Sequence, residues 1–206
     1  MTDQSMPQLA RRGAAVIAAV AAITLAVRFY LRWLQSESVW SALSYMAQYF
    51  TLLTNSMTLL LMIWIAIGRP ISLHLVKAII IAIVLVGVFY HALLSHLVNL
   101  SGLELWADHG THTFVPILSG LWWIFLASKP GFRWSDVGLW LIWPVVYVVY
   151  IMTRASFSGF YPYPFLNLPE IGWGGLIPGV AGLFVTFIVV GLLMTVLGRF
   201  FGPRPG

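Results

Sequence analysis

The stretch ISLHLVKAIIIAIVLVGVFYHALLSHLV, from Ile71 to Val98, is almost wholly apolar over a length that can cross a lipid bilayer. A helix needs about 20 predominantly apolar residues to span the hydrocarbon core. The ionisable side chains of this stretch lie toward its two ends, which leaves the middle entirely aliphatic or aromatic. The stretch therefore predicts a membrane-spanning helix.

Five more segments of similar character lie on either side of it, separated by turns rich in glycine and proline such as Gly68-Arg69-Pro70 and Lys129-Pro130-Gly131. The first segment is longer than the apolar region of a signal peptide, which is about 7–15 residues, so we expect it to be a retained helix. The six expected helices are residues 13–34, 40–67, 71–98, 108–127, 136–153 and 176–200. We predict one all-α domain over residues 1–206, a polytopic six-transmembrane-helix bundle.

The composition supports the same class. Apolar residues make up 60% of the 206 and charged residues 8%, whereas soluble domains carry about 25% charged residues. The net charge of +5 comes from residues scattered near the ends of the expected helices. Because no basic patch interleaved with aromatic residues is present, we expect the partner to be the lipid bilayer and no nucleic acid. The chain has no cysteine, which excludes disulfides and thiolate chemistry.

The distribution of Lys and Arg predicts the orientation. With a cytoplasmic N-terminus, eight of the 11 basic residues fall on the inside and three, Arg28, Arg32 and Arg154, on the outside. The inside set is Arg11, Arg12, Arg69, Lys77, Lys129, Arg133, Arg199 and Arg204. This bias follows the positive-inside rule, so we expect both termini to be cytoplasmic.

Polar residues gather in the outer half of this arrangement, while the inner half is nearly all aliphatic. Asp108, His109 and His112 lie near the outer end of the fourth helix, and Arg28 and His91 reach the outer portions of the first and third. Ionisable side chains within a bilayer are costly and usually face a bundle interior or a polar cavity. The asymmetry predicts a polar site toward the outer leaflet, with His112 at its centre.

The second expected helix carries a polar stripe. Ser44, Gln48, Thr51, Asn55 and Thr58 follow one another at spacings of four and three, which places them on one helical face. Small and polar residues of this kind also promote packing between helices in lipid. The stripe is therefore compatible with packing alone or with a hydroxyl nucleophile.

His109 and His112 share a face and, with Asp108 and His91, have donor types that suit zinc. The alternative is acid–base chemistry by a neutral His112 beside a hydroxyl, with an acceptor fixing its tautomer. We expect Asp108 and His109 to lie at the interface, in contact with headgroups and water. His91 is as compatible with a structural hydrogen bond as with a catalytic role.

The fifth expected helix presents Trp143, Tyr147, Tyr150 and Arg154 on one face. Arg154 and Arg28 lie outside the preferred cytoplasmic distribution, which favours a specific anionic partner. That partner is either Asp108 or the carboxylate or phosphate of a lipid.

Four motifs occur in the same order as in androgen-induced membrane hydrolases, which include the FAR-17a-like proteins, and the chain resembles a bacterial member of that family. They are FTLLTN (Phe50–Asn55), VFYHALL (Val88–Leu94), HGTHTFVPIL (His109–Leu118) and YPYPFL (Tyr161–Leu166).

The resemblance implies a six-helix threonine hydrolase of the bacterial inner membrane that splits fatty acid esters of hydroxy fatty acids. It matches the nucleophile to Thr51, with Thr54 as the neighbouring alternative, and the histidine to His112. It implies covalent acyl transfer without a cofactor or a metal, on a membrane lipid substrate. Asn55, Gln48 or His91 are expected to stabilise the oxyanion, and Arg28 or Arg154 to hold a substrate carboxylate. Supporting roles are expected for Asp108, His109 and Tyr150.

Two other classes of protein remain compatible with the sequence. A proton-coupled or small-solute transporter would also place His, Arg and Asp at one depth, although transporters commonly show internal repeats, and this chain shows none. A non-catalytic lipid-binding membrane protein would need only the packing stripe and would tolerate the loss of Thr51 and His112.

Overall fold

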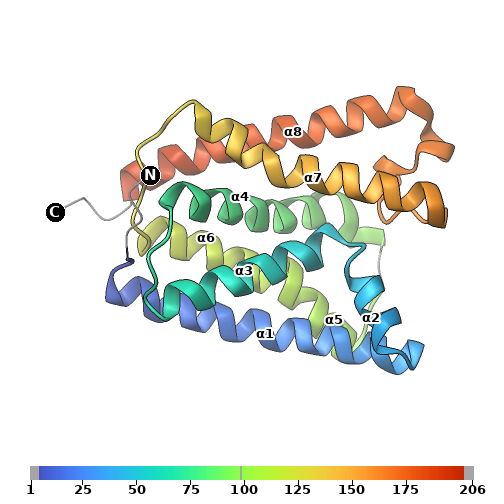
Figure 1. Ribbon diagram of the computed structural model, residues 1–206, viewed down its shortest axis with the longest axis horizontal. Helices are drawn as coiled ribbons and strands as arrows, with labels where there is room; N and C mark the ends of the chain where they lie inside the picture. The colour runs from blue at the N-terminus through green and yellow to red at the C-terminus, as the bar shows by residue number, and fades with distance from the viewer. Residues whose placement is uncertain (1–4, 98, 202–206) are drawn as a thin grey trace.

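The computed structural model describes residues 5–97 and 99–201, and this part of the chain consists of helices joined by short turns and loops, with no strand (Figure 1). The α-helices are α1 (Gln8–Ser36), α2 (Val39–Met46), α3 (Phe50–Ala66), α4 (Leu73–Phe89), α5 (Gly102–His109), α6 (Val115–Phe125), α7 (Ser135–Ser158) and α8 (Leu168–Phe201). Short non-α turns are the π-helical η1 (Tyr90–Leu94) and η3 (Gly110–Phe114) and the 3₁₀ turns η2 (Ser95–Leu97) and η4 (Pro164–Leu166).

Helix α4 is the central element, packed against α3, α6, α7 and α8. Its aliphatic residues Val76, Ile80 and Ile83 are fully buried, together with Trp123 of α6 and Phe187 of α8. In Figure 1 the long helices run side by side, and α1 starts at the same end of the bundle at which α8 ends. We call this the terminal end; α2 and α5 lie at the opposite end.

Four helical stretches are long and apolar enough to cross a membrane: α1, Leu73–Leu94, α7 and α8. The bent pair α2 and α3 makes a fifth if it is counted as one span. The run from α5 through η3 to α6 is also continuous in sequence, but Asp108, His109 and His112 make its first half polar.

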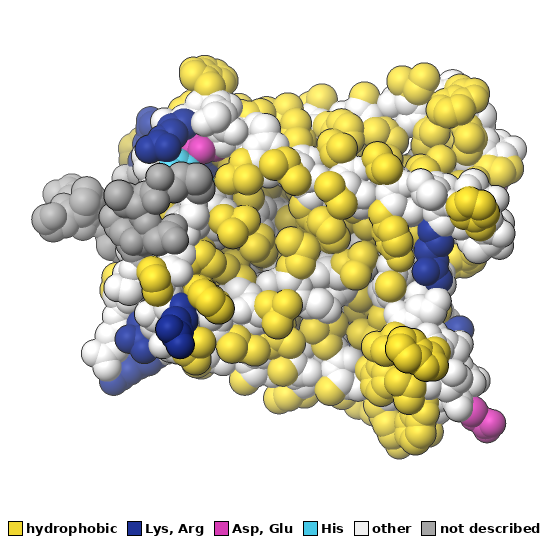
Figure 2. Space-filling model, in the orientation of Figure 1, with side chains coloured by type: hydrophobic (Ala, Val, Ile, Leu, Met, Phe, Trp, Pro, Cys, Tyr) yellow, Lys and Arg dark blue, Asp and Glu magenta, His cyan; other side chains and the backbone are white. Residues whose placement is uncertain are grey.

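The surface agrees with this assignment. Figure 2 shows an apolar belt around the middle of the visible face, with charged side chains at its two ends. Large apolar side chains such as Leu60, Val149 and Ile177 are exposed on the helices. Apolar surface of this extent is unfavourable in water and is consistent with an integral membrane protein.

The prediction for residues 40–67 was wrong in one respect, because the chain bends by 95° between α2 and α3. Ser38 caps the start of α2, accepting a hydrogen bond from the amide of Ser41 at 3.3 Å. The bend frees backbone carbonyls at Ala47 and Gln48, and α7 supplies donors for both. The Tyr147 hydroxyl donates to Gln48 O at 2.8 Å and the Tyr150 hydroxyl to Ala47 O at 3.1 Å.

The other boundaries differ mainly at the ends. Helix α1 begins at Gln8, α5 at Gly102 and α8 at Leu168, all earlier than expected. Helix α8 contains a kink at Gly172, whose positive φ of 61° suits glycine. Val98, the expected end of the third helix, and Arg204 lie outside the described residues.

Candidate active site

A cavity of about 340 Å³ opens toward the end of the bundle opposite the terminal end, and both Thr51 and His112 line it. Thr51 comes from the start of α3 and His112 from η3. The cavity wall also includes charged and aromatic side chains from five further parts of the chain, among them Arg28, Asp108, Tyr90, Tyr49 and Tyr163. Residues far apart in sequence therefore converge on one space with a polar side.

Asp108 and His112 form the centre of the polar side. His112 Nδ1 lies 3.1 Å from Asp108 Oδ1 and 3.2 Å from the Asp108 carbonyl oxygen, one helical turn earlier. Both acceptors favour the tautomer in which Nδ1 carries the proton, and this leaves Nε2 as a hydrogen-bond acceptor. Arg28 of α1 forms an ion pair with the same carboxylate oxygen. Asp108 is 4% exposed, so the expectation that it lies at the interface was wrong.

An aromatic ring also packs against the face of the His112 imidazole. The ring of Tyr90 stacks on it with a centroid distance of 3.9 Å and an angle of 13° between the planes. Tyr90 begins the π-helical turn η1 and His112 lies within the π-helical turn η3. Such turns are rare and occur frequently at functional sites; here they bring the two rings together.

Two glycines allow η3 to approach its neighbours. A Cβ atom on Gly110 would lie 2.4 Å from Oγ1 of Thr24 on α1. A Cβ on Gly87 of α4 would lie 3.0 Å from Pro116 Cβ and 3.1 Å from the His112 carbonyl oxygen. The close packing of η3 between α1 and α4, which places His112, therefore depends on the absence of side chains at these positions.

Thr51 is the second residue of α3, just after the 95° bend, and its 9% exposure reflects contact with the cavity. The bend places Thr51 at the start of a helix, where the amides of Leu52 and Leu53 donate to the Tyr49 carbonyl at 3.1 Å and those of Phe50 and Thr51 have no partner within the helix. Asn55 Nδ2 donates to the Thr51 carbonyl at 2.8 Å and to the Thr111 carbonyl at 3.1 Å. This buried amide fixes the start of α3 against η3.

Thr54 occupies a different environment. It is fully buried, it is absent from the cavity wall, and its hydroxyl accepts a hydrogen bond from Trp143 Nε1 at 2.9 Å. Of the two threonines that the sequence left open, Thr51 is the one that shares a cavity with His112. The contacts in the described residues include no hydrogen bond between Thr51 and His112; catalytic hydrogen bonds are often long in substrate-free sites.

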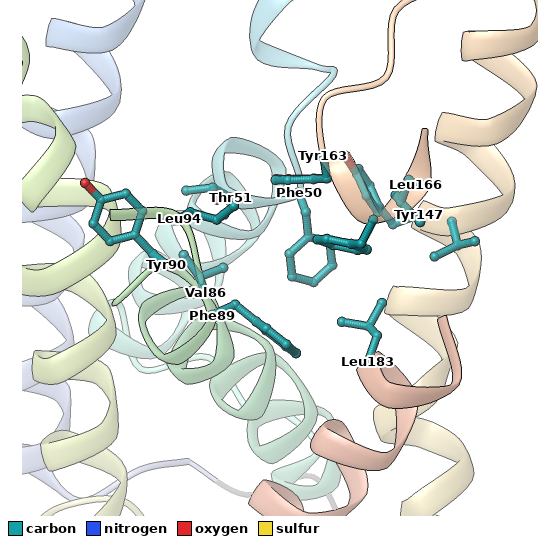
Figure 3. A pocket seen from close by; sticks show the side chains of 12 residues that line it. Phe50, Thr51, Val86, Phe89, Tyr90, Leu94, Tyr147, Tyr163, Leu166 and Leu183 are labelled. Atoms are coloured by element: carbon teal, nitrogen blue, oxygen red, sulfur yellow. The ribbon is translucent and has the colours of Figure 1, made fainter. Parts of the chain in front are cut away.

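Tyr163 brings a further aromatic side chain to the cavity. It lies in the segment between α7 and η4, and it lines the cavity together with Thr51. Figure 3 shows the two residues in the wall of a neighbouring apolar pocket. Burial raises the pKa of the Tyr163 phenol, so the group is neutral at pH 7 and can donate a hydrogen bond.

Several residues expected at the site serve other contacts. Arg154 donates to the side chain and carbonyl of Ser44 on α2, at 2.7 and 3.3 Å. Together with Tyr147 and Tyr150 it joins α7 to the α2–α3 bend. Neither Arg154, Tyr150, Gln48 nor Asn55 is among the residues that line the cavity. They support the position of Thr51 from outside it.

His91 and His109 meet elsewhere, at the hydroxyl of Thr113. His91 Nε2 lies 3.0 Å and His109 Nδ1 3.4 Å from Thr113 Oγ1. The donors of the zinc hypothesis thus separate into two sets, with His112 on Asp108 and the other two histidines on Thr113. Within residues 5–97 and 99–201, no group of three His, Cys, Asp or Glu side chains is arranged to hold a metal ion.

Tyr90 and Tyr163 are site residues that the sequence did not single out. Each lies in a motif that carried the family resemblance, VFYHALL and YPYPFL, but neither is ionised at neutral pH or shows a helical spacing tied to His112. The packing of distant segments brings both to the cavity, where Tyr90 stacks on His112.

Compared with models of known protein families, with curated proteins and with solved structures, the chain matches none. The description of the site therefore rests on its own geometry.

Proposed function

We propose that the protein is an intramembrane lipid ester hydrolase in which Thr51 is the nucleophile and His112 the general base. The observation that supports this most directly is the shared cavity of Thr51 and His112, combined with the contact between His112 Nδ1 and Asp108. Many hydrolases activate a hydroxyl nucleophile with a histidine. One ring nitrogen of that histidine bonds a carboxylate, and the other nitrogen faces the hydroxyl.

In the first half of the reaction, Thr51 Oγ attacks the ester carbonyl while His112 Nε2 accepts its proton. The C–O bond to the alcohol then breaks, and His112 returns the proton to the departing alkoxide oxygen. Asp108 remains ionised, orients the ring and stabilises the imidazolium. The product of this half is an acyl group esterified to Thr51.

In the second half, water attacks the acyl-enzyme with His112 as the base, and the carboxylic acid leaves as Thr51 regains its proton. Each tetrahedral intermediate carries an oxyanion that needs hydrogen-bond donors. The Tyr163 side chain, which lines the same cavity as Thr51, and the amides of Phe50 and Thr51 at the start of α3 are suited to this role. We assign the oxyanion to these donors instead of Asn55, Gln48 and His91, because those three residues do not line the cavity.

The resemblance to androgen-induced hydrolases suggests an ester of a hydroxy fatty acid as the substrate, which has a free carboxylate. Arg28 lines the cavity, and its Nε is buried without a hydrogen-bond partner among the described residues. We assign Arg28, in place of Arg154, to the recognition of that carboxylate.

The proposed topology has six spans, with both termini in the cytoplasm of a bacterial cell and the site toward the outer leaflet of the inner membrane. Arg11 bonds the Ala66 carbonyl near the end of α3, Lys77 bonds Thr195, and Lys129 lies beside Gly198 near the end of α8. These basic residues thus gather at the terminal end, whereas Arg28 lies at the cavity, as expected from the positive-inside rule.

The test is labelling of the purified full-length protein in detergent with a fluorophosphonate probe, which reacts with activated hydroxyls. We expect labelling of the wild type and of Thr54→Ala, and none of Thr51→Ala or His112→Ala. Thr54→Ala is the matched control, because it removes the same hydroxyl from the same helix outside the cavity.

Two results would overturn the proposal. Labelling that persists in Thr51→Ala would place the reactive group elsewhere, and an unlabelled wild type that is well folded would argue against an activated hydroxyl. Loss of labelling on addition of a chelator would favour a metal-dependent hydrolase instead.

A further inference from the structure

Thr51 lies between two spaces of different character. On one side is the cavity that holds Arg28, Asp108 and His112; on the other is a smaller pocket of about 50 Å³ among α4, α7 and α8. Four residues, Thr51, Tyr90, Leu94 and Tyr163, belong to the walls of both. The two spaces are therefore adjacent, and the Thr51 side chain stands at their junction.

The smaller pocket is apolar. Its wall beyond the junction consists of aliphatic and aromatic side chains, including Val86, Phe89, Leu166 and Leu183, and it includes no charged residue or histidine. In Figure 3 the Tyr90 hydroxyl points away from the other lining side chains. The chemistry of this wall suits a hydrocarbon chain and offers nothing to a polar or charged group.

We propose that the acyl chain of the substrate occupies this apolar pocket and that the pocket restricts it to a short chain. The inference rests on the proposed function. An ester carbonyl at Thr51 has two substituents, and only the larger cavity has Arg28 to receive a polar alcohol part. The acyl chain then extends past Thr51 toward α8.

The size of the pocket sets the length. One water molecule needs about 10–15 Å³ by the same measure, and a methylene group is of similar size. A pocket of about 50 Å³, far smaller than the neighbouring cavity of about 340 Å³, therefore suits a chain of a few carbon atoms. Leu183 of α8 and Phe89 of α4 form the far wall as Figure 3 shows it, and they limit any longer chain.

The chemistry is the same acyl transfer: Thr51 Oγ bonds the short-chain acyl carbon, the alcohol leaves with the proton from His112, and water releases a short-chain carboxylic acid. The substrate class is thus a short-chain acyl ester of a larger, polar alcohol.

The test uses p-nitrophenyl acetate, butyrate, octanoate and palmitate with the full-length protein in detergent. For the wild type we expect kcat/KM on butyrate to exceed that on octanoate by about tenfold or more, since each methylene without space costs binding. Leu183→Ala lengthens the pocket and should raise the octanoate-to-butyrate ratio by about tenfold. Leu183→Phe fills the pocket and should lower kcat/KM on butyrate relative to kcat/KM on acetate.

Leu193→Ala is the matched control, because Leu193 lies on the same helix, is 53% exposed and is not part of the pocket wall. It should keep the wild-type profile. A Thr51-dependent activity whose chain-length profile is flat, favours palmitate or does not respond to either Leu183 variant would overturn the inference and leave the proposed function intact. A wild type that hydrolyses none of the four esters would overturn both.

Discussion

Asp108 is a buried carboxylate that pairs with both Arg28 and His112. Its carboxylate accepts contacts from Arg28 of α1 and from the ring of His112, and it is nearly inaccessible. A buried carboxylate is retained at a cost unless its partners compensate for the lost hydration. The contact with Asp108 engages Nδ1 of His112 and therefore leaves Nε2 as the free ring nitrogen.

Replacement of Asp108 by asparagine should slow the reaction of Thr51 while leaving the fold in place. An amide can hold the ring in either tautomer and does not stabilise the imidazolium, so we expect the labelling rate to fall by roughly a hundredfold or more. Glu104→Gln is the control, because Glu104 lies on the same helix and contacts Gln35 at 3.3 Å, away from the cavity. Equal rates for Asp108→Asn and wild type would show that the carboxylate has no part in orienting His112.

Lys129 gives a second prediction at this scale, at the terminal end. Burial lowers the pKa of its ammonium group from 10.5 to about 8, and the group lies 5.0 Å from the centre of the Trp123 ring. The folded state therefore binds fewer protons than the unfolded state between these two pKa values. The free energy of unfolding should rise as the pH increases from about 8 to about 10.5.

Lys129→Met removes this group and should make the melting temperature in detergent higher at pH 7 and less dependent on pH across that window. The measurement is a thermal melt of both proteins at pH 7 and pH 10. A wild-type melting temperature that falls over the window, with no change on substitution, would contradict the assignment.

At the scale of the elements, the π-helical turn η3 places His112 and the α2–α3 bend places Thr51. The bend puts Thr51 at a helix start, and three side chains of α7, Tyr147, Tyr150 and Arg154, hold it by bonds to backbone or serine oxygens of residues 44–48. The glycines at 87 and 110 let η3 lie close to α4 and α1. The site is therefore set by packing between segments.

Gly110→Ala tests this placement. The new methyl group would overlap Thr24, and we expect a loss of stability of about 1–3 kcal/mol together with reduced labelling of Thr51. The double variant Gly110→Ala with Thr24→Ala should recover part of both. Gly138→Ala on α7, where a Cβ meets nothing within 4 Å, is the control. A Gly110→Ala protein as stable and as reactive as wild type would argue against the close approach.

At the scale of the whole molecule, the charged side chains lie at the two ends and the apolar belt lies between them (Figure 2). The absence of cysteine from the sequence makes the orientation easy to measure. Helix α7 ends with Ser158 at the end of the bundle opposite the terminal end, and Ser128 lies in the connection between α6 and α7 at the terminal end.

In intact cells, a membrane-impermeant maleimide should label Ser158→Cys at once and Ser128→Cys only after the inner membrane is permeabilised. The expected order follows from the excess of basic residues at the terminal end. The reverse order would place the termini outside and the cavity toward the cytoplasm.

The all-helical character, consistent with an integral membrane protein, could be predicted from the sequence, because long apolar runs with few charges can satisfy their backbone polar groups in a bilayer only as helices. Four of the expected spans correspond to the long apolar helices α1, Leu73–Leu94, α7 and α8, and the bent pair α2 and α3 makes a fifth if it is counted as one span. Thr51 and His112 remain predicted site residues, drawn from the few polar residues among hydrocarbon and from motifs that resemble a known family; in the structure both line one cavity.

Which polar residues meet depends on the packing of the whole bundle. The 95° bend that brings Thr51 to the cavity is held by hydroxyl groups of α7, which lie far in sequence from the carbonyls they bind. The pairing of Arg28 with Asp108, the stacking of Tyr90 on His112 and the position of Tyr163 in the cavity wall likewise join distant segments. Local pattern predicts which face of a helix a residue occupies, but the neighbour across that face depends on how all the helices pack.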